Sequence, residues 1–214
     1  MTEFWLIRHA QTPANVGQRV SDPGSYGLTP TGDNQARWLG EIWWFEPDLI
    51  VTSPYLRTKL TARPIQERYP GVPEEEWQVQ EYSPYAKHFY APELTRQEMR
   101  DLRNQYRQQC DPYLVTGDGA ESFVNLLKRA QTFLDRILDR PEERILIFSH
   151  ATFTRAVYWV WLHGGVSGTP RTMERFFSFR HPFPIPNTSY VHGRVMNGRV
   201  YLSNPITDHL DEWR

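Results

Sequence analysis

The sequence predicts an α/β fold: a three-layer α/β/α sandwich with a mostly parallel central sheet, an antiparallel edge and a small cap insertion. Short apolar runs alternate along the chain with longer segments of helical periodicity, the pattern of a parallel sheet covered by helices on both faces. Near the end, Asn197-Gly198 separates residues 189–191 from 199–202, and this dipeptide is a strong hairpin signal. The hairpin predicts the antiparallel edge.

The first strand and helix are marked by an apolar run and a capping signal. Residues 4–7 are apolar throughout, as expected of a strand covered on both faces. A polar stretch follows, and then Thr29 and Pro30 predict a helix start as N-cap and first helical residue. Apolar residues recur at helical spacing from there to Trp43, so this helix should pack on the sheet.

The second strand and helix follow the same order. Residues 48–52 are interpreted as another buried strand. Ser53 and Pro54 should open a helix that runs towards Tyr69. Pro64 falls inside that segment, and because proline removes a backbone donor we expect it to kink the helix or end it early.

The second half of the chain repeats the alternation. Residues 123–138 predict an amphipathic helix, because their apolar side chains keep to one face. Residues 144–148 predict a third buried strand, and residues 151–162 a further helix. Strand and helix therefore alternate three times before the terminal hairpin.

The length of 214 residues suits a single domain, so residues 1–214 are interpreted as one unit. Residues 82–118 lack strong periodicity and contain several prolines; we expect a cap-like excursion with one polar helix over 95–109. The formal charge of −1 gives no global field for nucleic acid or an anionic membrane, so neither partner is expected. Cys110 is the single cysteine, and the apolar run at the start is too short for a signal peptide. The cytoplasm is the expected location.

Candidate functional residues follow each of the three predicted parallel strands. Arg8 and His9 come after the first, Arg57 lies shortly after the second, and His150 follows the third. Ligand sites in open α/β sheets gather at the carboxyl ends of strands, so these side chains should meet at one edge. Two guanidinium groups beside two imidazoles indicate an anion site, because planar guanidinium forks match phosphate oxygens. The same charges disfavour a divalent cation, and no metal-ligand spacing is present, so no metal is expected.

A wider set of segments occurs in a fixed order along nearly the whole chain. They are residues 6–12 (LIRHAQT) with Asn15, 28–32 (LTPTG), 35–36 (QA), 52–54 (TSP) with Arg57, 61–62 (TA), 119–123 (GAESF), 149–151 (SHA) and 187–189 (NTS). Together they resemble the signature of the histidine phosphatase superfamily, the phosphoglycerate mutase-like enzymes. Any single segment is a weak signal, but the set in this order is specific.

The resemblance implies a role for each matching residue. His9 matches the nucleophile that becomes phosphohistidine, and Glu81 resembles the family's proton donor. The implied phosphate pocket consists of Arg8, Asn15, Arg57 and His150. The family uses neither metal nor cofactor for this chemistry. A nucleophilic imidazole must be neutral, so we expect its second nitrogen to donate to a backbone carbonyl and the guanidiniums to oppose its protonation.

Three departures from the family pattern carry information. Ala10 stands where the best-known motif has glycine, and it would add strain if that position needs a positive φ. Tyr82 and the residues after it replace a glycine-containing segment that commonly follows the donor glutamate, which makes Glu81 the weakest catalytic assignment. Ala151, rather than aspartate, follows His150, which sets the phytase and acid phosphatase branch aside.

Substrate recognition is the part that the sequence constrains least. The excursion offers Tyr82, Lys87 and His88 as candidate substrate contacts, although its aromatic residues could equally pack the cap onto the helices beneath. Ordinary surface residues are the favoured interpretation of Arg171, Arg175, Arg180 and His181. The favoured function is hydrolysis of a small phosphomonoester through phospho-His9. A phosphoglycerate mutase-type phosphotransferase and a non-catalytic phosphate- or phosphoprotein-binding module remain alternatives, and the oligomeric state is not predicted.

Overall fold

The computed structural model describes residues 1–90, 94–179 and 182–210. Its centre is a six-stranded sheet with the order β3-β2-β4-β1-β5-β6. The four parallel strands are β1 (Glu3–Arg8), β2 (Leu49–Thr52), β3 (Glu74–Glu76) and β4 (Arg144–Ser149). The antiparallel edge is formed by β5 (Tyr190–Met196) and β6 (Arg199–Leu202). The mostly parallel sheet with its antiparallel edge is therefore confirmed.

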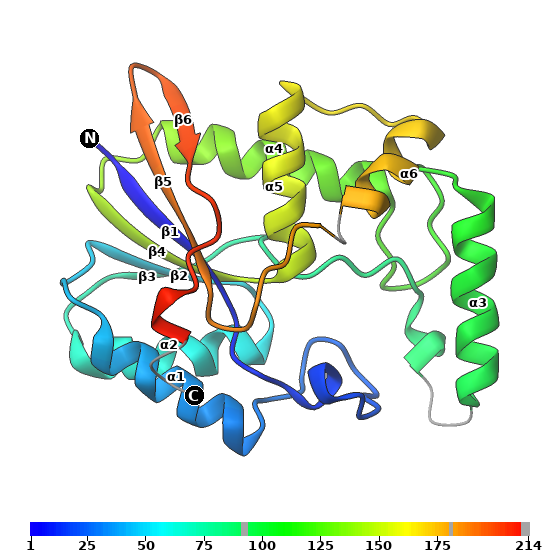
Figure 1. Cartoon of the computed structure of the whole chain (residues 1–214), viewed down its shortest axis with the longest axis horizontal. Coiled ribbons are helices and arrows are strands. Elements are labelled where there is room, and N and C mark those ends of the chain that lie inside the picture. The colour runs from blue at the N-terminus through cyan, green and yellow to red at the C-terminus, as the bar shows by residue number, and fades with distance from the viewer. Residues whose placement is uncertain (91–93, 180–181, 211–214) are drawn as a thin grey trace.

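Helices cover both faces of the sheet, as Figure 1 shows. One face carries α1 (Pro30–Ile42) and α2 (Leu56–Arg68), and the other carries α4 (Phe123–Leu138) and α5 (Ala151–His163). The alternation of side chains along β1 divides the core in two. Phe4 and Leu6 belong to the cluster under α4 and α5, whereas Trp5 and Ile7 belong to the cluster under α1 and α2. The three-layer prediction is confirmed.

The start of α1 follows the capping signal read from the sequence. The Thr29 side chain accepts a hydrogen bond from the backbone N–H of Gly32 at 3.0 Å, and Pro30 is the first helical residue. The helix ends at Ile42, and Trp43, just past its end, is buried in the core. Thr29 also bonds to the loop after β1 through Gln11, so this cap helps to position the segment that follows the first strand.

Helix α2 starts later than predicted and ends close to Tyr69, as expected. It begins at Leu56, after Tyr55 as the N-cap, and it runs through Pro64 to Arg68. Of the two effects expected of Pro64, a kink or an early end, the early end is wrong, because the proline is held in the contact between α1 and α2. A Cβ on Gly40 of α1 would lie only 2.7 Å from the Cβ of Pro64, so the two helices approach closely there. Packing at this contact compensates for the single backbone hydrogen bond that proline removes.

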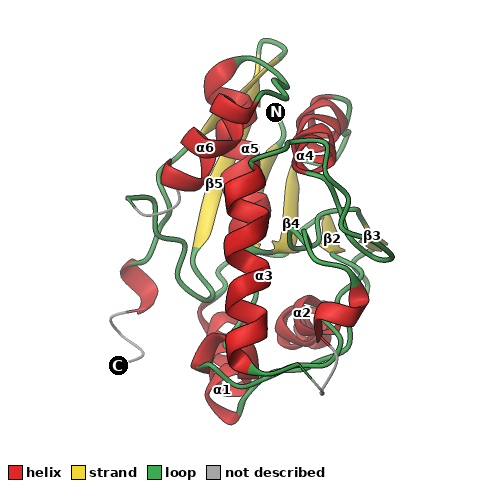
Figure 2. Cartoon of the chain, turned by 90° about the vertical axis from the view of Figure 1, so that its right-hand side faces the viewer, coloured by secondary structure: helices red, strands yellow, loops and turns green. Residues whose placement is uncertain are grey.

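The excursion at 82–118 includes the short helix η2 (Lys87–Tyr90) and the helix α3 (Arg96–Gln109). Thr95 and Glu98 form a capping box at the start of α3, in agreement with the predicted polar helix. In Figure 2, α3 stands beyond the carboxyl ends of the parallel strands, in front of the sheet. This position places it on the side of the molecule where the candidate site residues lie.

Several elements were not anticipated from the sequence. They are β3, α6 (Pro170–Phe179) and the short helices η1 (Pro13–Val16), η2 and η3 (Asp208–Leu210). The terminal hairpin is confirmed, with Asn197 at φ 52° and Gly198 at φ 69°, as a tight two-residue turn requires. None of the helices within the described residues has the length and apolar character needed to cross a membrane.

Candidate active site

The structure brings the predicted histidines and Arg57 together at the carboxyl ends of β1, β2 and β4. The register pairs Arg8 of β1 with Ser149 of β4, so the residues that follow these two strands are neighbours. The rings of His9 and His150 lie 5.0 Å apart between centroids, and Nη2 of Arg57 lies 3.1 Å from Nδ1 of His150. All three side chains are buried, with 4, 1 and 0% of the surface of His9, Arg57 and His150 exposed.

The imidazole of His9 is fixed in one orientation by the backbone. Its Nδ1 lies 2.7 Å from the carbonyl oxygen of Ala10, so Nδ1–H donates there and Nε2 keeps its lone pair. Burial, followed by the positive charges of Arg57 and Arg8, holds the pKa of His9 well below its ordinary value of 6.5. The ring is therefore neutral at physiological pH, with one nitrogen available as a nucleophile.

Ala10 adds no backbone strain to this arrangement. Among the described residues the non-glycine positions with positive φ are Cys110, Thr188 and Asn197, so Ala10 adopts an ordinary conformation. Its N–H donates to the hydroxyl of Thr61 at 3.0 Å, which ties the loop after β1 to helix α2. The glycine of the usual motif is therefore not required here.

Arg57 is held by a carbonyl, an imidazole and two aromatic rings. Its Nη1 donates to the carbonyl oxygen of Pro23 at 2.6 Å, and its guanidinium carbon lies 4.5 Å from the ring centroid of Tyr26 and 4.7 Å from that of Tyr55. Arg8 is anchored in a similar way, because its Nη1 donates to the carbonyl oxygen of Ile185 at 2.6 Å. Both guanidiniums are thus fixed before any ligand binds.

Each of these guanidiniums retains one unsatisfied donor. The Nε atoms of Arg8 and Arg57 are buried and have no hydrogen-bond partner among the described residues. A buried donor without an acceptor costs about 1–3 kcal/mol, and such groups are rare in folded proteins. A bound anion would supply the missing acceptors, so the two arginines have the properties of an oxyanion pocket.

His150 is oriented by a chain of hydroxyl groups that sequence reasoning missed. Its Nε2 lies 2.8 Å from Oγ of Ser53, which in turn lies 2.9 Å from Oγ1 of Thr58. Nδ1 of His150 then faces Arg57 and the pocket. Burial, followed by the charge of Arg57, lowers the pKa of His150 well below 6.5. Because a guanidinium can only donate, Nδ1 of His150 accepts from Arg57, so Nε2 carries the ring proton and donates it to Ser53.

Glu81 and Asn15 form hydrogen bonds to different parts of the candidate site. One carboxylate oxygen of Glu81 accepts from the backbone N–H of Tyr82 and of Thr152, each at 3.0 Å, which holds it at the start of helix α5. The side-chain amide nitrogen of Asn187 donates two hydrogen bonds. One goes to the side-chain oxygen of Asn15 at 3.1 Å, and the other goes to the backbone carbonyl oxygen of His9 at 2.9 Å. Asn15 therefore supports the backbone of His9 through Asn187.

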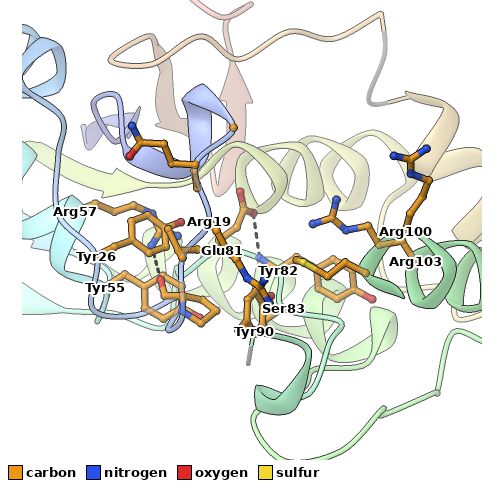
Figure 3. A pocket seen from close by; sticks show the side chains of 16 residues that line it. Arg19, Tyr26, Tyr55, Arg57, Glu81, Tyr82, Ser83, Tyr90, Arg100 and Arg103 are labelled. Carbon is orange, nitrogen blue, oxygen red and sulfur yellow. Dashed lines mark hydrogen bonds between the residues drawn. The ribbon is translucent and has the colours of Figure 1, made fainter. Parts of the chain in front are cut away.

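A cavity of about 500 Å³ opens beside Arg57 and Glu81, and Figure 3 shows its lining. Four tyrosines contribute to this lining: Tyr26, Tyr55, Tyr82 and Tyr90. Tyr26 and Tyr55 were not anticipated, since they come from loops without periodicity. The Tyr82 ring lines the cavity, although its hydroxyl is bonded to that of Tyr106.

The structure does not bring the other two candidate substrate contacts to this cavity. Lys87 is exposed and pairs with Asp118 at 2.9 Å, and His88 lines a separate hollow beside Phe89. Among the rim candidates, Arg171 and Arg175 are exposed on α6, whereas Arg180 and His181 lie outside the described residues. Within the described part of the chain, histidine, cysteine and acidic side chains form no group of three or more that could hold a metal ion.

Two curated phosphatases are similar to this chain in sequence. The chain is 43% identical over 68 residues to the uncharacterized phosphatase PhoE of Bacillus subtilis, although this match covers 31% of the chain and only 35% of that protein. It is 28% identical over 156 residues to the adenosylcobalamin/alpha-ribazole phosphatase of Salmonella typhimurium, covering 69% of the chain and 73% of that protein.

A phosphatase of known structure has the same fold, and the sequence model of a protein family matches most of the chain. Phosphoserine phosphatase from Entamoeba histolytica superposes with a TM-score of 0.69 at 23% identity, over 98% of this chain and 100% of that one. The family description of the histidine phosphatase superfamily (branch 1) matches residues 4–191. These residues include the buried histidines and both guanidiniums. The chain therefore belongs to branch 1 of the histidine phosphatase superfamily.

Proposed function

We propose that this protein is a metal-independent phosphomonoesterase that hydrolyses a small phosphorylated metabolite through a phosphohistidine on His9. The observation that carries the proposal is a neutral, buried imidazole beside two fixed guanidiniums whose Nε donors lack acceptors. The names of the curated relatives, both phosphatases, support the same reaction class. The single cysteine and balanced charge support a location in the cytoplasm and a small-molecule substrate rather than nucleic acid.

In the first step, the lone pair on Nε2 of His9 attacks phosphorus and the bond from phosphorus to the leaving oxygen breaks. Arg8, Arg57 and His150 would surround the transferring phosphoryl group. The Nε donors of the two arginines would stabilise the charge on its oxygens, and His150 would hold Arg57 in place. Nδ1–H of His9 stays bonded to the carbonyl oxygen of Ala10, which fixes the attacking nitrogen. Glu81 would give its proton to the leaving oxygen.

In the second step, a water molecule attacks phosphorus and the phosphorus–nitrogen bond of phospho-His9 breaks. The carboxylate of Glu81 would take the proton that water loses, which restores the protonated acid for the next cycle. Inorganic phosphate is released and neutral His9 is regenerated, so the two steps together convert one phosphomonoester and one water into the alcohol and phosphate. Residues 82–118 would form a cap over this reaction, since α3 stands beyond the same sheet edge.

The proposal is tested by measuring inorganic phosphate released from an aryl phosphate in the presence of excess chelator. Release that survives the chelator is expected, because guanidinium groups supply the positive charge. A strict metal requirement would contradict the mechanism. Isomerisation of phosphoglycerate without phosphate release would favour the mutase alternative instead, and phosphate binding without turnover would favour the binding module.

Glu81→Gln is expected to separate substrates by their leaving groups. The variant should lower kcat/KM for alkyl phosphates by about 10²–10⁴-fold, because a poor leaving group needs a proton. It should leave kcat/KM for activated aryl phosphates almost unaffected, because kcat/KM reflects the phosphorylation of His9 and not the later attack of water, in which Glu81 also acts. Rates of phosphate release on matched aryl and alkyl substrates measure this difference. An equal effect on both kinds would reject Glu81 as the proton donor.

The pH dependence should reflect the neutral histidines. Because burial and nearby arginines lower the pKa of His9, the nucleophile stays unprotonated as pH falls through 6.5, and kcat/KM should decline only at lower pH. Unfolded chains bind protons below about pH 6.5 that folded His9 and His150 do not, so fold stability should fall from that pH downwards. A pH–rate profile and urea unfolding at several pH values measure the two effects. An acid limb centred at or above pH 6.5 would contradict the first expectation.

A further inference from the structure

Three arginines on one face of α3 lie along the cavity and its extension. Arg100, Arg103 and Arg107 follow one another at spacings of three and four residues, which places them on the same side of the helix. Arg100 and Arg103 line the cavity that also contains Arg57 and Glu81 (Figure 3). Arg103 and Arg107 line an adjoining hollow that again includes Glu81. The row therefore begins at the candidate active site and leads away from it.

In the described part of the chain, no carboxylate forms an ion pair with an arginine of this row, whereas Arg129, Arg136 and Arg140 all have such a partner. The two acidic side chains of α3 are bonded elsewhere, Glu98 to Thr95 and Asp101 to Gln97. Like charges three or four residues apart on a helix repel one another. The row therefore costs stability that a bound anion would restore.

One cavity joins Arg57 to Arg100 and Arg103 of α3. Tyr90 of η2 lines this cavity together with Arg57 and Arg103. The guanidinium of Arg103 lies 5.4 Å from the ring centroid of Phe89, next to Tyr90 in η2. Because Arg57, Arg100 and Arg103 line one cavity of about 500 Å³, a single small ligand in it can contact both Arg57 and α3.

We infer that the preferred substrates carry a second anionic group, a carboxylate or another phosphoryl group, on the leaving alcohol, and that Arg100 and Arg103 bind it. This inference rests on the phosphatase function proposed above. The bond changes stay the same: His9 takes one phosphoryl group, and the leaving alcohol departs with its second anionic group intact. Tyr26 and Tyr90, between the two ends, would contact the linker that joins the two groups.

The test compares substrates that differ only in the second charge. Suitable pairs are glycerol 3-phosphate with 3-phosphoglycerate, and fructose 6-phosphate with fructose 1,6-bisphosphate, which differ in span. In at least one pair, the wild-type protein should prefer the substrate with the second anionic group by about 10–100-fold in kcat/KM. This is the usual scale for hydrogen bonds to a charged group. The preference should appear mainly in KM and should shrink as salt is raised.

The double variant Arg100→Gln/Arg103→Gln should bring that ratio close to one, and each single variant should lower it partly. Both positions are exposed, so glutamine can be accommodated, and circular dichroism checks that α3 persists. Arg37→Gln is the matched control, since Arg37 is exposed on α1 and does not line the cavity; it should keep the wild-type ratio.

The outcomes separate this inference from the proposed function. If the wild-type protein releases phosphate from the substrates without a second anionic group but shows no preference in either pair, the inference alone is overturned. An unchanged ratio in the double variant would also overturn it, because the preference would then arise elsewhere. If none of the four substrates, nor an activated aryl phosphate, yields phosphate, the proposed function fails as well.

Discussion

His9→Ala is expected to lower kcat by about 10⁵–10⁶-fold, the scale seen when a covalent nucleophile is removed. No other described side chain offers a neutral nitrogen that is both buried beside Arg57 and held by a backbone carbonyl with its second nitrogen free. His150, the neighbouring imidazole, already uses both nitrogens, one towards Arg57 and one towards Ser53. Release of inorganic phosphate from an aryl phosphate measures the loss.

His9→Asn is the second variant, because its side-chain amide can still donate to the carbonyl oxygen of Ala10 while offering no nucleophile. Both variants should lose the acid-labile phosphoprotein that the wild-type protein forms with a phosphodonor, because a phosphorus–nitrogen bond is stable in base and labile in acid. Thermal unfolding shows whether the fold is retained. Activity within tenfold of wild type in a folded variant would reject His9 as the nucleophile.

The main elements could be predicted because their signals are local. The helix α4 keeps its apolar residues on one face, and the strands β1 and β4 are short apolar runs. The strand β3 was missed because its sequence is three glutamates, which have no apolar pattern. It becomes a strand through pairing with β2, and Glu75 within it bonds to arginines of α4 and of the segment that follows. Such a strand depends on tertiary contacts that no local pattern records.

Some residues of the candidate site could likewise be predicted from the sequence, and others could not. Positions that follow strands were predictable, since the fold itself brings the ends of β1, β2 and β4 together and with them His9, Arg57 and His150. The rings that hold Arg57 were not, because Tyr26 reaches it from a loop whose course depends on the finished fold. Proximity in sequence also misled: Lys87 follows Tyr82 closely, but it turns outward to Asp118.

Arg57→Lys is expected to lower kcat by about 10²–10³-fold although it keeps the positive charge. The guanidinium of Arg57 donates to the carbonyl oxygen of Pro23 and to His150 with two nitrogens, and its buried Nε remains for a phosphoryl oxygen. A lysine ammonium is a single point charge, so it cannot keep the anchor to Pro23 and present the same planar donors to a phosphate. Retention of wild-type kcat/KM would show that charge alone matters at this position.

Arg57→Ala adds a readout that a purely structural role would not produce. Arg57 is the second-largest cause, after burial, of the lowered pKa of His9. Removing this positive charge raises the pKa of His9 towards its ordinary value, so His9 protonates at higher pH and the acid limb of the remaining activity should move to higher pH. Arg63→Ala, an exposed arginine on the same helix, is the control and should leave the limb in place. If Arg57→Ala is folded and its limb coincides with that of the wild-type protein, the electrostatic coupling between Arg57 and the nucleophile is absent.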